Sequence, residues 1–250
     1  MENQRLRECL ASDFARLRDV VAAADLDAPV PSCPEWTVSD LARHVGTVYL
    51  HKVECMARGT EPDPWPPEGV AEEDPVALLD RAYAALAREF ETRSPDTRAA
   101  TWYAPDQSVG FWIRRMAQET VVHRVDAELA AGVARAPIPD DLALDGIDEF
   151  LYVMLAYGTT AWHDWASQVL VGTDSGAVRL AAGGGAWLVR PSPDGIEVTA
   201  GGHDGLAEVV GAPVELQLWL WGRAGDDAVT ITGDVDRVAQ LQKIIKFLGQ

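Results

Sequence analysis

Glu119 and His123 stand four residues apart in the stretch 111–131, FWIRRMAQETVVHRVDAELAA. Residues at positions i and i+4 of a helix lie one above the other on the same face. That face also carries Trp112 and Met116, which indicates that it points inward. A buried carboxylate and imidazole are costly without a partner, and a metal ion is one such partner. The alternative is a polar pair at the mouth of a helical bundle, or a core histidine held by a hydrogen bond.

A third metal ligand is available on the helix that we expect over residues 37–58, which carries His44 and His51. Seven residues advance a helix by about 10 Å, so the two imidazoles cannot both reach one ion at metal–nitrogen distances near 2 Å. His44 lies on the apolar stripe of this helix, whereas His51 has charged neighbours. We therefore predict a metal site made by His44, Glu119 and His123. Two imidazoles and one carboxylate suit zinc or a similar divalent ion, with a coordination position left open for catalysis.

Other side chains near these positions allow two interpretations each. Asp126 could orient His123 through a hydrogen bond, or it could be an exposed helix carboxylate. The three cysteines, Cys9, Cys33 and Cys55, are odd in number and form no CxxC pair, so neither a disulfide framework nor a cysteine zinc finger is indicated. Cys33 and Cys55 remain possible metal ligands, with buried structural thiols as the alternative.

Four helices must position these side chains. Apolar residues recur at helical spacing over residues 4–24, about 37–58, 75–91 and 111–131. The prolines of the segment 27–41 interrupt helix between the first two, and residues 60–75 and 92–110 have the composition of loops. We expect a metal-binding four-helix bundle over residues 1–136.

The second part of the chain has a different pattern, and we expect a domain boundary near residues 133–141. A helix over 145–158 precedes short β-like runs, which we place at 167–171, 177–181, 186–190 and 195–199. A helix over 212–220, a strand over 228–232 and a helix over 235–248 follow. This order predicts an α+β domain over residues 140–250 with a mostly antiparallel sheet.

The composition excludes some classes of partner. The net charge is −18, with a sequence pI near 4.5, and such a surface repels nucleic-acid phosphates and anionic lipid heads. No apolar signal core and no run of about 18 apolar residues occurs, so we expect a cytoplasmic protein without membrane contact. The sequence does not predict an oligomeric state.

Two motifs resemble a known family. The motif P-x-W-T-V-x-D-L-x-x-H at residues 34–44 and the motif Q-E-T-V-V-H-R-V-D-A-E at residues 118–128 are similar to those of the mycothiol-dependent maleylpyruvate isomerase family. The N-terminal domain of that family belongs to the DinB-like group of metal-binding four-helix bundles. The patterns E-L-x-L-W-L-W-G-R at 215–223 and V-T-I-T-G-D at 229–234 resemble its second domain, which has a sterol-carrier-like α/β character.

The resemblance implies roles for particular residues. It implies that His44, Glu119 and His123 bind zinc, and that the zinc faces a cleft where mycothiol binds through its sulfur. It also implies that an arginine of the C-terminal domain contributes to activity, and Arg223 of the W-G-R motif is the matching residue. A structural arginine paired with an acidic side chain is the alternative for Arg223.

The predicted chemistry is activation of a thiol. A zinc ion with an open position lowers the pKa of a bound thiol, so that a nucleophilic thiolate exists at neutral pH. Addition of the thiolate to a small electrophile, followed by rotation and elimination, isomerises a double bond, whereas addition or displacement alone transfers the thiol. The predicted function is thus a mycothiol-dependent isomerase or thiol S-transferase. A zinc hydrolase that activates water, or a non-catalytic protein that binds a small ligand, is the alternative.

Side chains that could form the wall of the cleft come from the loops, from the helix over residues 111–131 and from the W-G-R motif. The aromatic candidates are Trp36, Trp65, Trp102 and Tyr103. Arg115 and Arg223 could hold an anionic group, because guanidinium pairs well with carboxylates. Surface arginines without such a role are the alternative.

Overall fold

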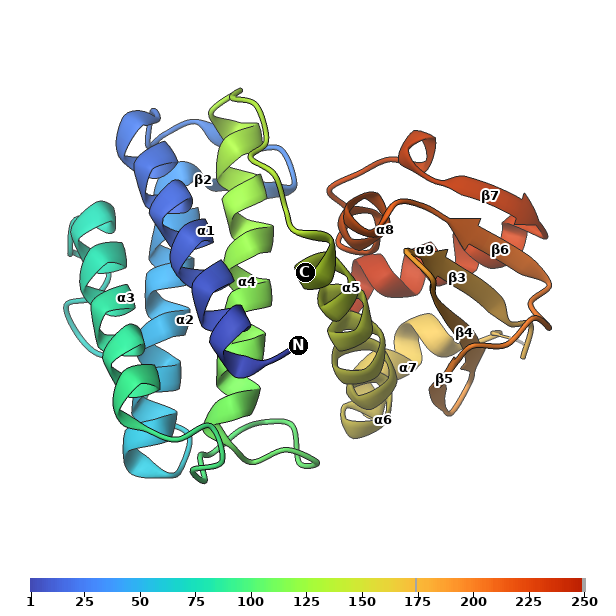
Figure 1. The fold of residues 1–250 in the computed structure, drawn as a ribbon, viewed down its shortest axis with the longest axis horizontal. Coiled ribbons are helices and arrows are strands. Elements are labelled where there is room, and N and C mark those ends of the chain that lie inside the picture. Colours follow the sequence, from blue (N-terminus) through green and yellow to red (C-terminus); the bar gives the residue numbers. More distant parts are fainter. Residues whose placement is uncertain (174, 249–250) are drawn as a thin grey trace. The chain divides into compact units, whose positions relative to one another are not determined.

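The computed structural model describes residues 1–173 and 175–248. The chain divides into two compact units, Met1–Pro137 and Ile138–Gln250 (Figure 1). The last two residues of the domain predicted over 140–250 lie outside the described residues. Within the described part of the chain, no helix has both the length and the apolar character needed to cross a membrane.

The first unit is a bundle of four long helices. They are α1 (Asn3–Ala23), α2 (Val38–Arg58), α3 (Pro75–Thr92) and α4 (Val109–Ala130). α1 packs mainly against α4 and α2 mainly against α3, and α2 also contacts α4. These contacts place α2 and α4 side by side, although the 50 residues 59–108 separate them in the sequence.

Capping residues fix where these helices begin and end. Thr37 starts α2 with a capping box, in which its side chain accepts a hydrogen bond from the Asp40 backbone amide and Asp40 accepts one in return. Gly59 ends α2 with a φ of 70°, a left-handed conformation that costs glycine little. Asp74 and Ser108 cap the first turns of α3 and α4.

The proline-containing segment before α2 forms two short antiparallel strands, which were not predicted. They are β1 (Pro29–Val30) and β2 (Cys33–Thr37). β1 contacts α4 and β2 contacts α2. The segment is therefore fixed against the two helices that carry the predicted metal ligands.

α4 is the central helix of the bundle, because residues on almost every side of it are buried. The buried residues include polar and charged side chains, namely Arg115, Gln118, Thr120, His123, Arg124, Asp126 and Glu128. Buried charges are costly unless they are paired or bind a metal, so each of these needs a partner inside the bundle.

The second unit begins with a run of helical turns and continues with a five-stranded sheet. The helical segments are α5 (Asp140–Glu149), a π-helix at Phe150–Tyr157, α6 (Gly158–Ala161) and α7 (His163–Leu170). The strands are β3 (Val178–Ala182), β4 (Gly185–Ser192), β5 (Gly195–Ala200), β6 (Ala207–Val210) and β7 (Thr230–Gly233). α8 (Pro213–Leu220), a short 3-10 turn at Asp226–Ala228 and α9 (Val235–Leu248) complete the unit.

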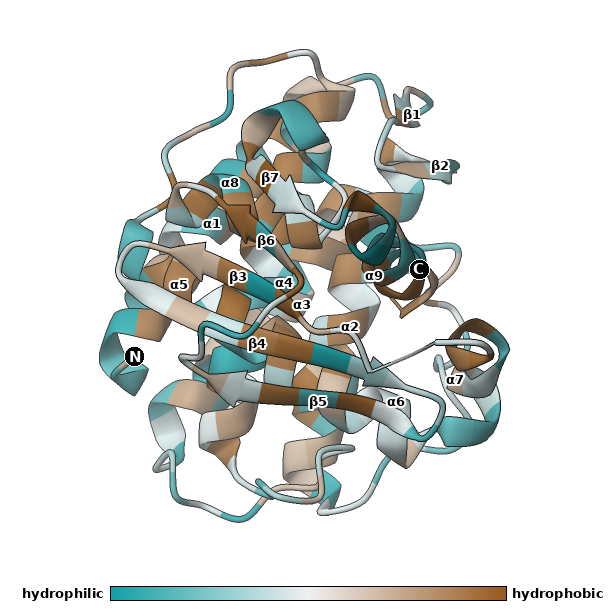
Figure 2. Cartoon of the chain, turned by 90° about the vertical axis from the view of Figure 1, so that its right-hand side faces the viewer, coloured by the Kyte–Doolittle hydropathy of each residue, from teal (hydrophilic) through white to brown (hydrophobic). Residues whose placement is uncertain are grey.

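The sheet has the order β5-β4-β3-β6-β7, and only the β3–β6 pair is parallel. Gly183 and Gly184 connect β3 to β4, with φ values of 52° and 86°. A two-residue hairpin turn of type I′ needs positive φ at both residues, which explains the glycines. Side chains on β3 alternate between buried and half-buried, and apolar residues line β4 and β5 (Figure 2). The buried ones pack with apolar residues of the π-helix, α8 and α9 to form the core.

The predicted fold class, a helical bundle followed by an α+β unit with a mostly antiparallel sheet, is confirmed. The strand predicted over 167–171 is wrong, since these residues belong mostly to α7. Ala166 and Leu170, four residues apart, are both buried, so the segment packs with helical rather than alternating periodicity. The strand β6 was missed, because its four residues are too few to show a clear alternation.

Candidate metal centre

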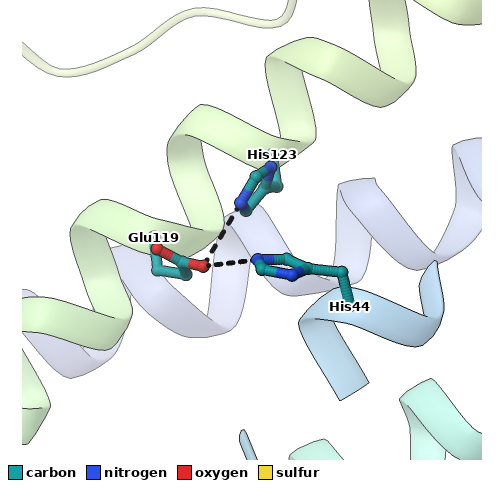
Figure 3. A group of neighbouring side chains, drawn as sticks. All are labelled: His44, Glu119 and His123. Carbon is teal, nitrogen blue, oxygen red and sulfur yellow. Dashed lines mark hydrogen bonds and ion pairs between the residues drawn. The ribbon is translucent and has the colours of Figure 1, made fainter. Parts of the chain in front are cut away.

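The side chains of His44, Glu119 and His123 converge inside the bundle (Figure 3). The Oε1 atom of Glu119 lies 3.2 Å from Nε2 of His44 and 3.2 Å from Nε2 of His123. One ligand atom from each of the three residues can be chosen so that all lie within 4.8 Å of one another. Among the described residues, this is the group of three or more histidine, cysteine or acidic side chains that could hold a metal ion.

The convergence follows from the two helices that carry the residues. Glu119 and His123 occupy one face of α4, one turn apart, and His44 lies in the second turn of α2. The indole of Trp36 on β2 covers the two imidazoles, with ring centroids 4.6 Å from His44 and 6.0 Å from His123. The short strand before α2 therefore contributes one wall of the site.

The charges around Glu119 keep it ionised. Burial by itself raises the pKa of a carboxyl group, but the Arg115 guanidinium, which pairs with Glu119 one turn away, and the His123 imidazole hold the pKa of Glu119 well below its usual range. Burial likewise disfavours charge on His123, yet the neighbouring Glu119 and Asp126 carboxylates raise its pKa to about 9. Without a metal, the centre thus retains a proton between Glu119 and His123.

Asp126 orients His123 from behind. Its Oδ2 atom lies 2.9 Å from Nδ1 of His123, and its Oδ1 atom accepts a hydrogen bond from the Ser32 hydroxyl at 2.5 Å. Asp126 is fully buried, so the interpretation of this residue as an exposed helix carboxylate is wrong. A proton on Nδ1 that is donated to a carboxylate leaves the lone pair of Nε2 free, and metal-binding histidines commonly have such a partner.

The donor set fits a divalent metal of the zinc type. Two imidazole nitrogens and one carboxylate oxygen are common zinc ligands, and bond lengths of about 2.0–2.1 Å in a tetrahedral arrangement put neighbouring donors about 3.3 Å apart. The two distances of 3.2 Å from Glu119 Oε1 match this spacing. The His44 side chain is 34% exposed, whereas those of Glu119 and His123 are 13% and 9% exposed. An additional ligand would therefore approach from the side of His44.

A cavity of about 640 Å³ opens on that side. One stripe of α2 from Asp40 to Lys52 forms its floor, and the indoles of Trp36 and Trp65 form parts of its wall. We call this cavity the α2 groove. His44 belongs both to the groove and to the group of three converging side chains.

His51 does not join the other imidazoles. Its Nδ1 atom lies 3.2 Å from Nζ of Lys52 and 3.4 Å from Sγ of Cys55, and its ring packs edge-on against Trp65 at 5.1 Å. Burial lowers the pKa of His51 to about 4 and raises the pKa of the Cys55 thiol. His51, which lines the α2 groove, and the buried Cys55 thus form a neutral pair apart from Glu119.

The remaining candidate residues lie in different places. Trp36 and Trp65 border the α2 groove, whereas Trp102 and Tyr103 pack around Phe111 at the start of α4, with ring centroids 5.3 and 5.4 Å from it. Arg115 is buried against Glu119.

The other possible thiol ligand and the arginine of the second unit also have defined surroundings. Cys33 has its sulfur 4.0 Å from Oδ2 of Asp126. Arg223 follows α8 in the second unit, where its Nη1 donates a hydrogen bond to the Trp221 carbonyl at 2.6 Å.

Two residues with defined contacts around the centre were not among the candidates. Ser32 bonds to Asp126 across 94 residues of sequence, and no local pattern indicates such a contact. The ammonium of Lys52 lies 4.6 Å from the centroid of the buried Trp112 ring. Its position eight residues after His44, on the same helix face, was the available signal.

Comparisons with known proteins agree with this architecture. No curated protein matches the chain. The structure resembles the crystal structure of the mycothiol-dependent maleylpyruvate isomerase, with 18% identity, a TM-score of 0.63 and coverage of 94% of this chain and 95% of that chain. A mutant of that enzyme with one histidine replaced by alanine matches with the same identity, TM-score and coverage. At this identity the likeness shows the fold.

Family models match most of the sequence. The mycothiol maleylpyruvate isomerase N-terminal domain matches residues 7–128, and the C-terminal domain of the same family matches residues 141–240. Together the two matches cover both units in the expected order. The chain therefore belongs to the mycothiol-dependent maleylpyruvate isomerase family.

Proposed function

We propose that this protein is an enzyme that uses zinc, held by His44, Glu119 and His123, to activate mycothiol for addition to a small electrophilic substrate. The observation that carries the proposal is the convergence of three ligand atoms within 4.8 Å, with the buried Asp126 behind His123. Membership of the family supports a thiol-dependent isomerase.

Bound zinc supplies one kind of chemistry here, the lowering of a thiol's pKa so that the thiolate exists at neutral pH. The thiolate would add through its sulfur to one carbon of an activated double bond, whose π electrons would move onto an adjacent carbonyl group as an enolate. Rotation about the carbon–carbon bond, which is then single, and re-formation of the double bond with loss of the thiolate would give the isomerised alkene. Protonation of the enolate in place of elimination would give a thioether, which is the transferase outcome.

The side chains of the chain have separate roles in this proposal. Asp126 fixes the His123 ring so that Nε2 faces Glu119, and Arg115 keeps Glu119 ionised and fixed. Trp36 shields the imidazoles from water on one side. A drier site strengthens the attraction between the ligands and a cation.

Arg223 is proposed to contribute to activity from the second unit by pairing with an anionic group of the substrate. Guanidinium binds carboxylates in a bidentate manner, which lysine cannot reproduce. We expect Arg223→Lys to lower kcat/KM while zinc content stays unchanged. Equal kcat/KM in the variant would remove Arg223 from the proposal.

The proposed setting is the cytoplasm, where a small thiol and a small electrophile are the partners. The net charge of −18 disfavours nucleic acid and anionic membrane surfaces as partners.

Metal analysis and thiol titration test this function together. Protein purified without a histidine tag should carry one zinc per chain, and His44→Ala should lose it. His51→Ala is the matched control, because this imidazole is on the same helix but faces Cys55 and Trp65, so its loss should leave zinc content unchanged.

Mycothiol is then titrated into zinc-loaded and metal-free protein. Much tighter binding to the zinc-loaded form is expected, since the sulfur binds the metal. Equal binding to both forms would contradict thiol activation. Hydrolysis of an activated ester by the zinc-loaded protein without any thiol would favour the water-activating alternative.

A further inference from the structure

We propose that the α2 groove binds the body of the thiol, so that its sulfur reaches the centre at His44 while the rest lies along α2 toward Lys52. This inference rests on the proposed function and adds the part of the molecule that recognises the thiol. The occupant to which we commit is an uncharged, hydroxyl- and carbonyl-bearing body attached to the cysteine-like end.

The α2 groove is continuous with the candidate metal centre. His44 is shared by both, and its side chain is the most exposed of the three converging residues. A ligand bound at the open side of the centre must therefore extend past His44. The groove is the described cavity that begins there.

The α2 groove has the length and volume needed for the body of the thiol. The groove residues of α2 recur at spacings of three and four from Asp40 to Lys52, which defines a single helix face. His44 and Lys52 are eight residues apart, so the face extends about 12 Å beyond the centre. The volume of about 640 Å³ falls within the range of roughly 300–1,000 Å³ that holds ligands of drug size. A small electrophile alone would leave most of this space empty.

The walls of the α2 groove combine apolar ring faces with hydrogen-bonding groups. Two half-buried indoles, Trp36 near His44 and Trp65 near His51, offer apolar ring faces at separate positions along the groove. Aromatic side chains contribute large contact area together with a polar tip. Thr47 between them adds a hydroxyl that can donate and accept. Apolar faces alternating with hydrogen-bonding groups suit a body made of hydroxylated rings.

The acidic and basic side chains that line the α2 groove are equal in number. Two acidic residues, Glu35 and Asp40, and two basic residues, Arg43 and Lys52, line the groove. In a chain of net charge −18, this local balance provides no excess of positive charge for a polyanion. An uncharged body that uses both donors and acceptors meets less repulsion than a dianion would, because like charges destabilise each other when water is displaced.

Lys52 provides the anchor at the far end. Its ammonium contacts neutral groups, the Nδ1 atom of His51 at 3.2 Å and the ring of Trp112 at 4.6 Å. An ammonium has three N–H donors, so these contacts leave donor capacity for a carbonyl or hydroxyl oxygen of a ligand. Lys52 is half-buried, which strengthens such a hydrogen bond relative to one at the surface.

The experiment compares three ligands on the full-length, zinc-loaded protein by calorimetric titration. Mycothiol carries both the sulfur and the body. N-acetylcysteine carries the thiol without the further body. S-methyl mycothiol keeps the body but lacks a free thiol, so its binding reports on the groove without the metal.

Two variants remove groove contacts, Trp65→Ala and Lys52→Met. Each should weaken mycothiol and S-methyl mycothiol by about tenfold or more, since a few buried aromatic and charged contacts dominate binding. Each should change the affinity for N-acetylcysteine by less than about twofold and leave one zinc per chain. The KM for mycothiol should rise with little change in kcat, because the lost contacts do not touch the reacting atoms.

Trp65→Phe should recover part of the loss, since it restores an aromatic face. Arg58→Met is the matched control for charge, because this exposed cation lies at the end of α2 outside the groove. It should leave the binding of all three ligands unchanged.

The outcomes separate this inference from the proposed function. If mycothiol needs zinc but binds the groove variants within twofold of wild type, or if the wild-type protein does not bind S-methyl mycothiol, the groove is not the thiol site. If the variants weaken N-acetylcysteine as much as mycothiol, the loss is a disturbance of the centre and the inference is also wrong. If mycothiol binds equally with and without zinc, the thiol activation fails, while the effect of the variants on S-methyl mycothiol still decides the groove.

Discussion

Helix α4 carries two buried clusters of charged residues, one turn apart, and only one of them can hold a metal. Near its middle, Glu119 and His123 meet His44. Toward its end, Arg124 and Glu128 meet Asp13 and Arg16 of α1. We call the second group the closed ion cluster.

In the closed ion cluster, the guanidinium groups of Arg16 and Arg124 pair with the carboxylates of Asp13 and Glu128. Nε of Arg124 lies 2.8 Å from Oδ1 of Asp13, and its Nη1 lies 2.8 Å from Oε2 of Glu128. Oε1 of Glu128 accepts hydrogen bonds from Nε of Arg16 at 2.8 Å and from the Ala136 amide at 3.1 Å. Arg124 and Glu128 are almost completely buried. This cluster joins α1, α4 and the segment that leads out of the bundle.

The candidate metal centre differs in having acceptor atoms that point at one another. Two imidazole nitrogens and a carboxylate oxygen converge, and without a metal a proton held between Glu119 and His123 reduces their repulsion. Both clusters bury charge. We infer that the cluster whose acceptor atoms converge toward an open side can bind a metal, whereas the cluster whose carboxylates pair with guanidinium groups is structural. The following predictions test that distinction, beginning with the largest effect.

Replacing the carboxylate in each cluster should separate metal binding from stability. Glu119→Gln removes one of three ligands and should weaken zinc by three orders of magnitude, on the order of 4 kcal/mol, given total zinc binding energies of about 10–16 kcal/mol. Glu128→Gln should retain one zinc per chain. Zinc competition with a chelator measures both. Zinc loss in the Glu128 variant, with the fold intact by circular dichroism, would remove the distinction.

Removing the central cation of the closed ion cluster should mainly affect stability. Arg124→Met leaves Asp13 and Glu128 buried without this guanidinium, and the free energy of unfolding should fall by about 3–5 kcal/mol. Urea unfolding of the zinc-loaded protein measures the change. The triple variant Asp13→Asn, Arg124→Met, Glu128→Gln should recover most of the loss, because no fully buried charge remains and Arg16, whose side chain is 40% exposed, can be hydrated. A stability equal to that of wild type in Arg124→Met would show that the cluster is not structural.

The two clusters should respond to pH in different ranges. The pKa of His123 is raised from 6.5 to about 9 in the metal-free protein, so its stabilising contribution is complete below pH 6.5 and is lost as pH rises through 9. A shift of this size corresponds to roughly 3 kcal/mol of unfolding free energy. Asp13, whose pKa burial raises to about 6, loses its proton mostly below this range.

Unfolding of metal-free protein between pH 6.5 and 9 measures this loss. Zinc-loaded protein should show no such decrease, because zinc replaces the proton and binds more tightly as pH rises. Asp13→Asn should leave the decrease unchanged, and a metal-free protein of constant stability over this range would contradict the assignment to His123.

The contact behind His123 should have the smallest effect. Asp126→Asn keeps the size of the side chain but removes the charge that orients the imidazole, and should weaken zinc about 10–100-fold. Ser32→Ala, which removes only the hydrogen bond to the other oxygen, should weaken it less. The order would be reversed if Asp126 acted only by filling space.

The structure brings together some residues that the sequence indicated and separates others. Glu119 and His123 share a face because four residues make about one helical turn. The strand predicted over 167–171 failed because a short apolar run fits either periodicity, and packing of Ala166 and Leu170 selected the helix. Of the aromatic residues predicted to form the wall of the cleft, Trp36 and Trp65 border the α2 groove, whereas Trp102 packs against Phe111.

By itself, the sequence determined the four helices of the bundle and the residues that share each helix face, because these depend on neighbours within a turn or two. Only the tertiary structure decided which faces meet. The contact of Ser32 with Asp126 spans 94 residues, that of His44 with Glu119 spans 75, and the α2 groove needs strand β2 before α2 and the loop after it. Such contacts arise from the packing of distant segments, and no local periodicity specifies them.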